Sequence, residues 1–316
     1  MPDIVLSKIL LFADDTKVYR NIETIDDVEK LQADIDQLAD WADTWQLQFH
    51  PDKCKILSLG KHPTQYIYTM ENKILDHSLA EKDVGVVIDS RLNFEEHITE
   101  KIKVANKIVG LIRRSFVHLD VDMLGKLFKS MVRPHLEYAV QTWKPNTKEK
   151  YKEIEDVQRK ASKLIGEIRE LDYQERLRIL KLPCLAYRRM RGDMIEVFKQ
   201  MRGRYDPEIQ QILRRANMGQ NRTRGHSLKL ITRKPMRNYG KFMFSSRVVK
   251  IWNSFPEILV SAPNIQTFES RLDRFWQLLD DELKYNWEKV YEYENRVITP
   301  VPSRIVLRVY ESMYNN

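Results

Sequence analysis

Ile9-Leu10-Leu11-Phe12-Ala13-Asp14-Asp15-Thr16-Lys17-Val18-Tyr19 is the stretch that decides how the first part of this chain folds. Its apolar half is followed by two adjacent carboxylates and then by residues of high β-propensity. This pattern predicts a hairpin over residues 6–20 with Asp14 and Asp15 at the tip. Two neighbouring carboxylates are costly there unless a cation compensates them, and Mg²⁺ prefers carboxylate oxygens. A polar turn between two strands, with no metal, is the alternative interpretation.

The residues that follow the hairpin predict a mixed α and β region up to about residue 94. Apolar side chains at intervals of three and four predict a helix that ends near Trp45 and that either Asp26 or Asp27 can cap. The other predicted elements are a strand over 55–60, a hairpin over 66–75 that turns at Glu71-Asn72, and a strand over 83–88.

The rest of the chain reads mainly as helix. Prolines such as Pro134 and Pro183 separate the predicted helices. Residues 214–241 are basic without a clear period, which predicts a loop or an extended arm, and residues 285–316 support no clear prediction. The Trp and Phe residues at 252, 255, 268, 275 and 276 are interpreted as core rather than as platforms for stacked bases. The predicted helices lie near 95–116, 120–132, 148–170, 172–181, 184–202 and 266–284.

The net charge of +8 is unevenly distributed along the 316 residues. Residues 1–100 hold 10 Lys and Arg against 20 Asp and Glu, residues 101–250 hold 36 against 15, and residues 251–316 hold 7 against 10. The middle section is therefore strongly basic, which indicates a polyanion partner, with nucleic acid the first candidate. A solvated basic surface that only keeps the protein in solution is the alternative.

Other features of the sequence narrow the class of protein. Cys54 and Cys184 are far apart, which fits a reducing compartment and cannot by itself build a zinc site. No apolar run approaches the roughly 20 residues that a membrane span needs, and the first residues have no basic leader. We therefore expect an intracellular protein of the cytoplasm, the nucleus or both, neither secreted nor bound to a membrane.

Several blocks, taken in chain order, resemble the reverse transcriptases of non-LTR retrotransposons of the LINE type, in particular the jockey-like ones. The stretch from Ile9 to Tyr19 resembles the catalytic box of that family, and Leu47–Lys55 resembles the next palm motif. Asp83–Asp89 and Leu92–Ile98 resemble the primer-grip strand and the entry to the thumb. The resemblance covers roughly residues 4–276 and continues through Arg133–Ala139, Trp143, Pro145, Arg224–Leu228 and Val248–Pro256.

This resemblance implies roles for particular residues. Asp14 and Asp15 are then the catalytic carboxylates that bind Mg²⁺, and Lys53 is a catalytic lysine near the phosphates of the incoming nucleotide. Lys53 as an ordinary surface charge beside a strand is the alternative. The implied primer grip consists of Val84, Gly85 and Val86.

The same resemblance implies what is missing. Polymerases of this kind need a third carboxylate, a nucleotide-pocket motif and a fingers subdomain, and in the family all three precede the catalytic box. We therefore expect a truncated chain that is not catalytic alone. His50, where the family usually shows Asn, and Val84, where it shows Leu, are smaller departures.

The expected nucleic-acid surface follows the basic section. In the family the segment after the primer grip forms the thumb, which holds the template–primer duplex, and arginine suits phosphate and base contacts. An ordinary amphipathic surface helix and a flexible arm that folds only on RNA are the alternatives. The expected contact residues are Lys101, Lys103, Lys107, Arg113, Arg114, Arg214, Arg215, Arg222, Arg224, Arg233 and Arg237.

The predicted fold class is α+β, mainly helical. We expect a remnant of a reverse-transcriptase palm over 1–94, thumb-like helices over 95–170, a basic helical region over 171–284, and a tail over 285–316. The predicted function is that of a fragment of an RNA-directed DNA polymerase that binds an RNA template and a DNA primer. The alternatives are a non-catalytic RNA- or DNA-binding protein derived from the thumb and, with less support, a metal-dependent nuclease. The oligomeric state is not predicted.

Overall fold

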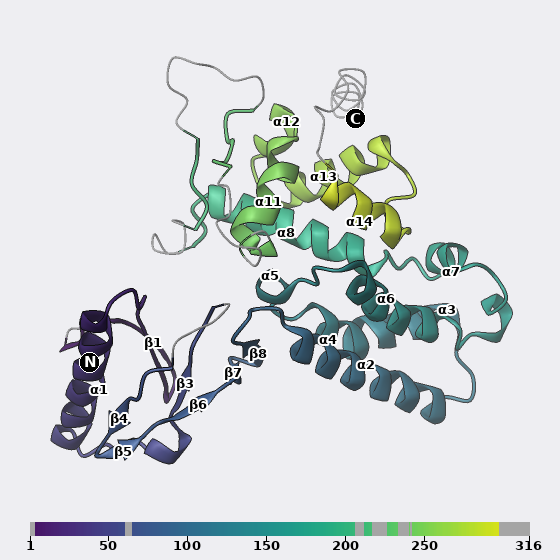
Figure 1. Cartoon of the computed structure of the whole chain (residues 1–316). Helices are drawn as coiled ribbons and strands as arrows, with labels where there is room; N and C mark the ends of the chain where they lie inside the picture. The colour runs from purple at the N-terminus through teal and green to yellow at the C-terminus, as the bar shows by residue number, and fades with distance from the viewer. Residues whose placement is uncertain are drawn as a thin grey trace. The chain divides into compact units, whose positions relative to one another are not determined.

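The computed structural model describes residues 4–60, 65–205, 212–216, 226–232, 240 and 242–296. They belong to two compact units, Met1–Leu92 and Asn93–Asn316 (Figure 1). The first unit is mixed α and β and the second is helical, which confirms the α+β, mainly helical class. Their identification as palm and thumb, and the finer division of the chain, stay predictions. Within the described part of the chain, no helix has the length and apolar character that a membrane span requires.

The described residues of the first unit form one long helix, α1 (Ile25–Thr44), and four small sheets of two strands each. The pairing of β3 with β6 is parallel and the other three pairings are antiparallel. The predicted hairpins over 6–20 and 66–75 are confirmed. The pairs are β1 (Lys8–Phe12) with β2 (Asp15–Tyr19), β3 (Lys55–Leu57) with β6 (Asp76–Ser78), β4 (Thr69–Met70) with β5 (Lys73–Ile74), and β7 (Ala80–Asp83) with β8 (Val86–Asp89).

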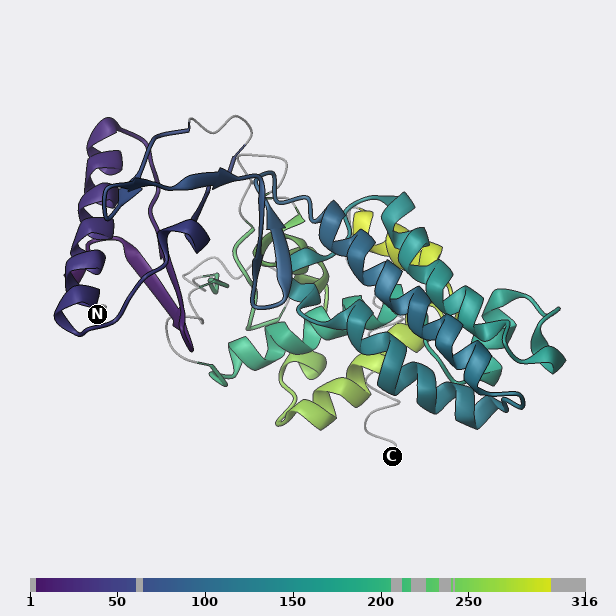
Figure 2. The same ribbon diagram turned by 90° about the horizontal axis from the view of Figure 1, so that it is seen from below.

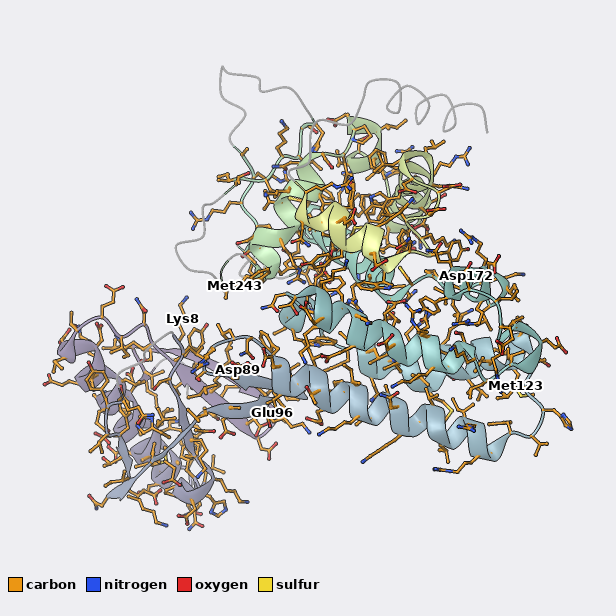
Figure 3. The ribbon with its side chains drawn as sticks, turned by 45° about the vertical axis from the view of Figure 1, so that its right-hand side comes forward. Lys8, Asp89, Glu96, Met123, Asp172 and Met243 are labelled. Atoms are coloured by element: carbon orange, nitrogen blue, oxygen red, sulfur yellow. The ribbon has the colours of Figure 1, made fainter. Side chains whose placement is uncertain are left out.

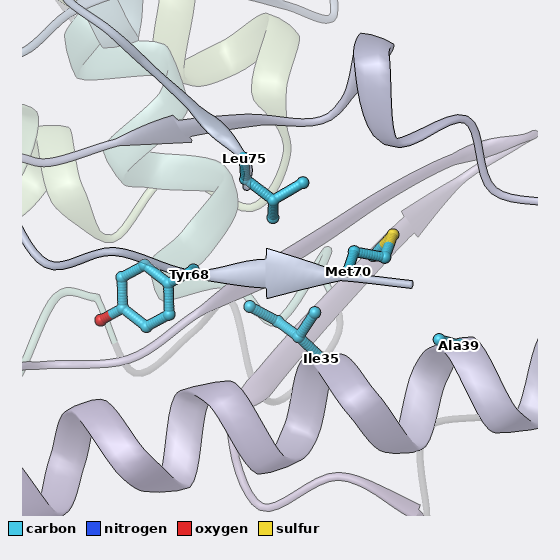
Figure 4. Close-up of a cluster of buried hydrophobic side chains, with 5 residues drawn as sticks. All are labelled: Ile35, Ala39, Tyr68, Met70 and Leu75. Atoms are coloured by element: carbon cyan, nitrogen blue, oxygen red, sulfur yellow. The ribbon is translucent and has the colours of Figure 1, made fainter. Parts of the chain in front are cut away.

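A small apolar cluster holds α1 against the β4–β5 region. Ile35 and Ala39 project from the helix toward Tyr68, Met70 and Leu75 (Figure 4). The spacing of Ile35 and Ala39 is one helical turn, so both lie on the same face of α1. This face is the apolar stripe that the sequence predicts.

The cap of α1 differs from the prediction. Thr24, not Asp26 or Asp27, is the N-cap residue, and its hydroxyl accepts a hydrogen bond from the backbone N–H of Asp27. The Asp27 carboxylate in turn accepts from the backbone N–H of Thr24 at 3.0 Å. This reciprocal capping box satisfies two helix-end donors and starts the helix earlier than an aspartate cap would.

The prediction of one strand over 83–88 is wrong. Val84 and Gly85 are the turn of the hairpin that joins β7 to β8, with φ values of 44° and 80° (Figure 2). Two-residue hairpin turns with both central residues in the left-handed region match the right-handed twist of the flanking strands, and glycine favours them. The candidate primer grip is therefore a turn and the first residue of β8.

The second unit is built around α8 (Leu185–Met201), which packs against α6, α11, α13 and α14. A second group of helices consists of α2 with α6, α4 and the π-helical segment Phe128–Val132. The remaining bounds are α2 (Glu95–Ser115), α3 (Val121–Leu127), α4 (Arg133–Glu137), α5 (Val140–Trp143), α6 (Lys148–Ser162), α7 (Tyr173–Ile179), α11 (Phe244–Asn253), α12 (Glu257–Val260), α13 (Ile265–Leu279) and α14 (Trp287–Asn295).

Pro134 does not end the helical run where the sequence predicts. The chain passes through the π-helical segment Phe128–Val132 and continues as α4, with Pro134 in its first turn. A proline there removes a donor that the first turn leaves unpaired in any case, so the helix tolerates it. The helices α5, α11, α12 and α14 were not predicted, because they are short or lie between prolines.

The aromatic residues near the end of the second unit form its core, as predicted. Trp252, Phe255, Phe268, Phe275 and Trp276 are all buried. The Trp252 ring lies 6.0 Å from each of the Phe255 and Phe268 rings, measured between centroids. These distances are typical of favourable aromatic pairs.

A buried group of charges also joins helices of this unit. The fully buried Asp193 of α8 accepts from Arg247 of α11 through both carboxylate oxygens, at 2.9 and 3.0 Å. It also accepts from Lys144 at 3.2 Å, and Lys144 pairs with Glu294 of α14. Burial raises the pKa of Asp193, but the facing charges of Arg247 and Lys144 outweigh burial, so its pKa is lowered overall. We refer to Lys144, Asp193, Arg247 and Glu294 as the buried ion cluster.

Candidate catalytic hairpin and nucleic-acid surface

The hairpin of β1 and β2 places Asp14 and Asp15 at an exposed turn. Phe12 pairs with Asp15, so Ala13 and Asp14 are the two turn residues, and Ala13 has a left-handed φ of 53°. Both carboxylates are exposed, and their oxygens are donors of the kind that Mg²⁺ prefers. Within the described ranges, no group of three or more His, Cys, Asp or Glu side chains is arranged to hold a metal ion. Within the described residues the two aspartates therefore have no third side chain of these types close enough to complete such a group.

A buried carboxylate on α1 holds the base of this hairpin. Asp34 accepts from the backbone N–H of Leu6 through Oδ1 and from that of Ser7 through Oδ2, both at 2.7 Å. Arg20, just after β2, donates to the Ser7 hydroxyl at 2.9 Å and reaches Asp34 at 3.4 Å. Burial raises the pKa of Asp34, but these hydrogen bonds lower it overall. Both ends of the hairpin are thus attached to one side chain.

Sequence reasoning did not find Asp34. It lies within the apolar stripe of α1, next to Ile35, and is only 1% exposed. A carboxylate in an otherwise apolar stripe has to find partners when it is buried. A charged residue within the apolar stripe was therefore the feature of the sequence that could have predicted a buried, hydrogen-bonded Asp34.

No hydrogen bond or ion pair in the described part of the chain connects Lys53 with Asp14 or Asp15. Lys53 ends the 3₁₀ turn Pro51–Lys53 and is exposed. The neighbouring Asp52 accepts from Lys73 at 2.7 Å, which connects this turn to β5. The assignment of Lys53 to the nucleotide phosphates stays a prediction.

The basic residues of α2 differ in solvent exposure and in the face of the helix on which they lie. Lys103, Lys107 and Arg114 are exposed and separated by four and seven residues, which places them on one face of the helix. That face is opposite to the buried Ala105 and Ile112. Figure 3 shows α2 from the labelled Glu96 onward, with side chains along one long side that extend away from the other ribbons of its unit. We call Lys103, Lys107 and Arg114 the α2 basic stripe.

Two of the predicted α2 contacts fall outside this stripe. Lys101 is half-buried on a different face and lies 3.8 Å from a carboxylate oxygen of Glu100. Arg113 is exposed but lies about 100° from the centre of the stripe, because each residue advances a helix by about 100°. Their role in nucleic-acid binding stays a prediction.

The described part of the basic arm is anchored to the core. Arg215 and Leu230 form an antiparallel bridge, and Arg215 donates to the carbonyl of Met201 at 2.5 Å. Arg214 is exposed beside it. The other predicted contact residues of the arm, Arg222, Arg224, Arg233 and Arg237, lie outside the described residues.

Residues of α11 hold the segment His226–Leu230, which ends at this bridge, by hydrogen bonds. Trp252 donates from Nε1 to the carbonyl of Leu228 at 2.7 Å, and its own carbonyl accepts from His226 at 2.9 Å. Asn253 donates to the carbonyl of Leu230 and accepts from its N–H, at 2.9 and 2.8 Å. Burial lowers the pKa of His226 and so favours the neutral ring, whose Nδ1 accepts from the backbone N–H of Leu228 at 3.1 Å. His226 and Leu228, in the described part of the Arg224–Leu228 block, thus contact the Val248–Pro256 block.

The arginines on α8 have partners inside the protein. Arg188 pairs with Glu137, and Arg191 donates to Asp273 at 2.8 Å. Arg189 is fully buried, with its guanidinium 5.2 Å from the centre of the Tyr151 ring. These side chains stabilise the helical unit and do not form part of an exposed basic surface.

Comparison with known proteins finds similarity to RNA-directed DNA polymerases of mobile elements. The chain is 29% identical over 177 residues to the probable RNA-directed DNA polymerase from transposon X-element of Drosophila melanogaster, which covers 52% of this chain and 19% of that protein. It is 25% identical over 185 residues to the RNA-directed DNA polymerase from mobile element jockey of the same species, covering 55% and 20%. The jockey polymerase of Drosophila funebris is 25% identical over 227 residues, covering 68% and 24%.

These similarities confirm the resemblance to jockey-like non-LTR retrotransposon reverse transcriptases. The chain spans about a fifth of the length of these relatives. No protein-family model and no solved structure matches the chain.

Proposed function

We propose that this chain is a fragment of a jockey-like RNA-directed DNA polymerase that binds an RNA template and a DNA primer, in the cytoplasm or nucleus, and that is not catalytic alone. The α2 basic stripe supports the binding role most directly. It joins three exposed cations on the side of α2 that faces away from the core. Its length is about 16 Å, because a helix rises 1.5 Å per residue. That is the axial rise of about five phosphates along one strand of a duplex.

The triple substitution K103Q/K107Q/R114Q is expected to weaken binding to an RNA–DNA duplex with a recessed primer end. Each phosphate contact that is lost reduces the slope of log affinity against log salt by about 0.9, so the slope should become flatter by up to about 2.7. Fluorescence anisotropy at several salt concentrations measures both the affinity and the slope.

The matched control removes three charges from another helix of the same unit. Lys152, Lys160 and Lys163 on or beside α6 are exposed. K152Q/K160Q/K163Q has the same net charge as the stripe variant and is expected to keep a slope close to that of the parent. If both variants lose affinity and salt dependence equally, the result supports the alternative, a basic surface without a defined contact.

The family resemblance implies that Asp14 and Asp15 hold Mg²⁺ together with a third carboxylate. The ion would stabilise the attacking and leaving oxygens of nucleotidyl transfer. The exposed turn leaves both carboxylates open to a primer end, which is consistent with this assignment. The proposal also includes the roles that the resemblance implies for Lys53, for the candidate primer grip Val84, Gly85 and Val86, and for Arg222, Arg224, Arg233 and Arg237.

The chain alone is expected not to extend a primer. The reason is that the resemblance assigns the third carboxylate and the nucleotide pocket to segments before the catalytic box. Incubation with primed poly(A) template, dTTP and Mg²⁺ tests this expectation. Robust extension that disappears in Asp14→Ala would show instead that the chain holds a complete catalytic site.

A further inference from the structure

The Asp14–Asp15 hairpin has a second attachment besides Asp34. Lys17 of β2 donates to the carboxylate of Asp83, the last residue of β7. Lys17 follows Asp15 by two residues, and Asp83 directly precedes the Val84-Gly85 turn. The ion pair therefore joins the two hairpins next to their turns, across 66 residues of sequence.

The two attachments differ in physical character. Asp34 is buried and accepts two backbone N–H groups through separate oxygens, an arrangement that fixes the direction of the chain where it enters β1. The side chains of Lys17 and Asp83 are 44% and 31% exposed. Such an exposed pair contributes little to folding stability, so any importance it has lies in where it holds the hairpin.

The hairpin needs such attachments because few other contacts hold it. Leu10, Leu11 and Phe12 of β1 are 53%, 49% and 63% exposed, so β1 contributes little to an apolar core within the described part of this unit. An isolated two-stranded hairpin is only marginally stable in water. Its turn can therefore move unless side chains hold both its base and its tip.

We propose that Asp34 and the Lys17–Asp83 pair are positioning residues that set where the Asp14–Asp15 turn lies relative to the Val84-Gly85 turn. Asp34 fixes the base of the hairpin, and Lys17–Asp83 sets the spacing between the two turns. The inference rests on the proposed function, in which these turns present the metal ligands and the primer end.

The ion pair is tested by measuring the spacing directly. Spin labels are attached at Asp15→Cys and Lys82→Cys in a Cys54→Ala background, where the remaining Cys184 is fully buried. Dipolar electron paramagnetic resonance then reports the distance distribution. A single narrow distribution is expected for the parent, and a broader or shifted one for Lys17→Glu and for Asp83→Lys.

The charge-swapped variant K17E/D83K is expected to restore the narrow distribution, because the pair is reversed rather than removed. Lys8→Glu on the same hairpin is the control for a change of charge alone and should leave the distribution unchanged. Identical distributions in all variants, or failure of the swap to restore the parent distribution, would overturn the role of the pair.

Asp34→Asn tests the other attachment. Asparagine replaces one of the two carboxylate oxygens by an N–H donor, so one of the two backbone N–H groups of Leu6 and Ser7 loses its own acceptor. Amide hydrogen exchange of β1 and β2 is expected to become at least about tenfold faster, with α1 unchanged. Asp40→Asn, an exposed position on the same helix, is the control. Unchanged exchange in Asp34→Asn, or equal changes in both variants, would refute the role of Asp34.

These measurements do not depend on nucleic-acid binding. If K103Q/K107Q/R114Q binds duplex as tightly as the parent, the proposed function fails while the hairpin distances still decide the positioning role. If the distances between the spin labels are the same in all variants while K103Q/K107Q/R114Q loses affinity for the duplex, the positioning role fails and the proposed function remains.

Discussion

Asp193→Asn is expected to lower the free energy of unfolding of the helical unit by about 3–5 kcal/mol, the usual cost of removing one partner from a buried ion pair. The substitution keeps the volume of the side chain but removes its charge. Arg247 and Lys144 then stay buried without the carboxylate that both of them contact. Since these side chains come from α11 and from the residue after α5, the loss should loosen the packing of both against α8.

Urea unfolding followed by far-ultraviolet circular dichroism measures this loss. Asp281→Asn is the matched control, because Asp281 is exposed and should change stability by less than about 0.5 kcal/mol. A loss below about 1 kcal/mol in Asp193→Asn would show that the buried ion cluster is not coupled to folding in this way.

The pH dependence of stability gives an independent check on Asp193. Its folded-state pKa is lowered, so its contribution is present above the unfolded value of about 3.9 and is lost as the pH falls through the folded pKa. The stability difference between the parent and Asp193→Asn should therefore shrink below about pH 4. A difference that stays constant at low pH would contradict this assignment.

Trp252→Ala is expected to cost about 3–5 kcal/mol, because it removes a fully buried ring from the aromatic core. It also removes the N–H that holds the carbonyl of Leu228. Trp252→Phe keeps most of the apolar contact but loses that hydrogen bond and part of the ring volume, so it should cost less than Trp252→Ala. Thermal or urea unfolding measures both variants.

Trp45→Ala is the control of the same residue type. Trp45 is 66% exposed and its ring lies 6.3 Å from that of Trp41, so its removal should cost less than about 1 kcal/mol. If Trp252→Ala is no more destabilising than Trp45→Ala, then Trp252 is not the core residue that the structure shows.

Local sequence rules were sufficient for several parts of this protein. The hairpin with Asp14 and Asp15 at its turn, the apolar stripe of α1 and the extent of α2 all follow from the period of apolar residues within a short window. The relationship to jockey-like reverse transcriptases also follows from the sequence, because ordered motifs are a linear property of the chain.

The predictions from sequence that were wrong concern residues whose environment depends on distant partners or on a turn inside an apolar run. Val84-Gly85 lies within a continuous stretch of β-formers, so its sequence predicts a strand while the chain turns there to pair β7 with β8. Arg188 and Arg191 belong to the basic section 101–250, whose charge indicates a polyanion partner, but both are paired inside the protein. Their carboxylate partners, Glu137 and Asp273, lie 51 and 82 residues away.

By itself, then, the sequence determined the fold class, the hairpin that carries Asp14 and Asp15, and the resemblance to jockey-like reverse transcriptases, because helix and strand periods and motif order are local or linear. Tertiary structure decided which cations face solvent on the α2 basic stripe and which are neutralised in the core. It also decided that Asp34 holds the base of the hairpin and that α11 holds the segment His226–Leu230. The physical reason is that burial and hydrogen-bond pairing depend on segments that are far apart in the chain and meet only when it folds.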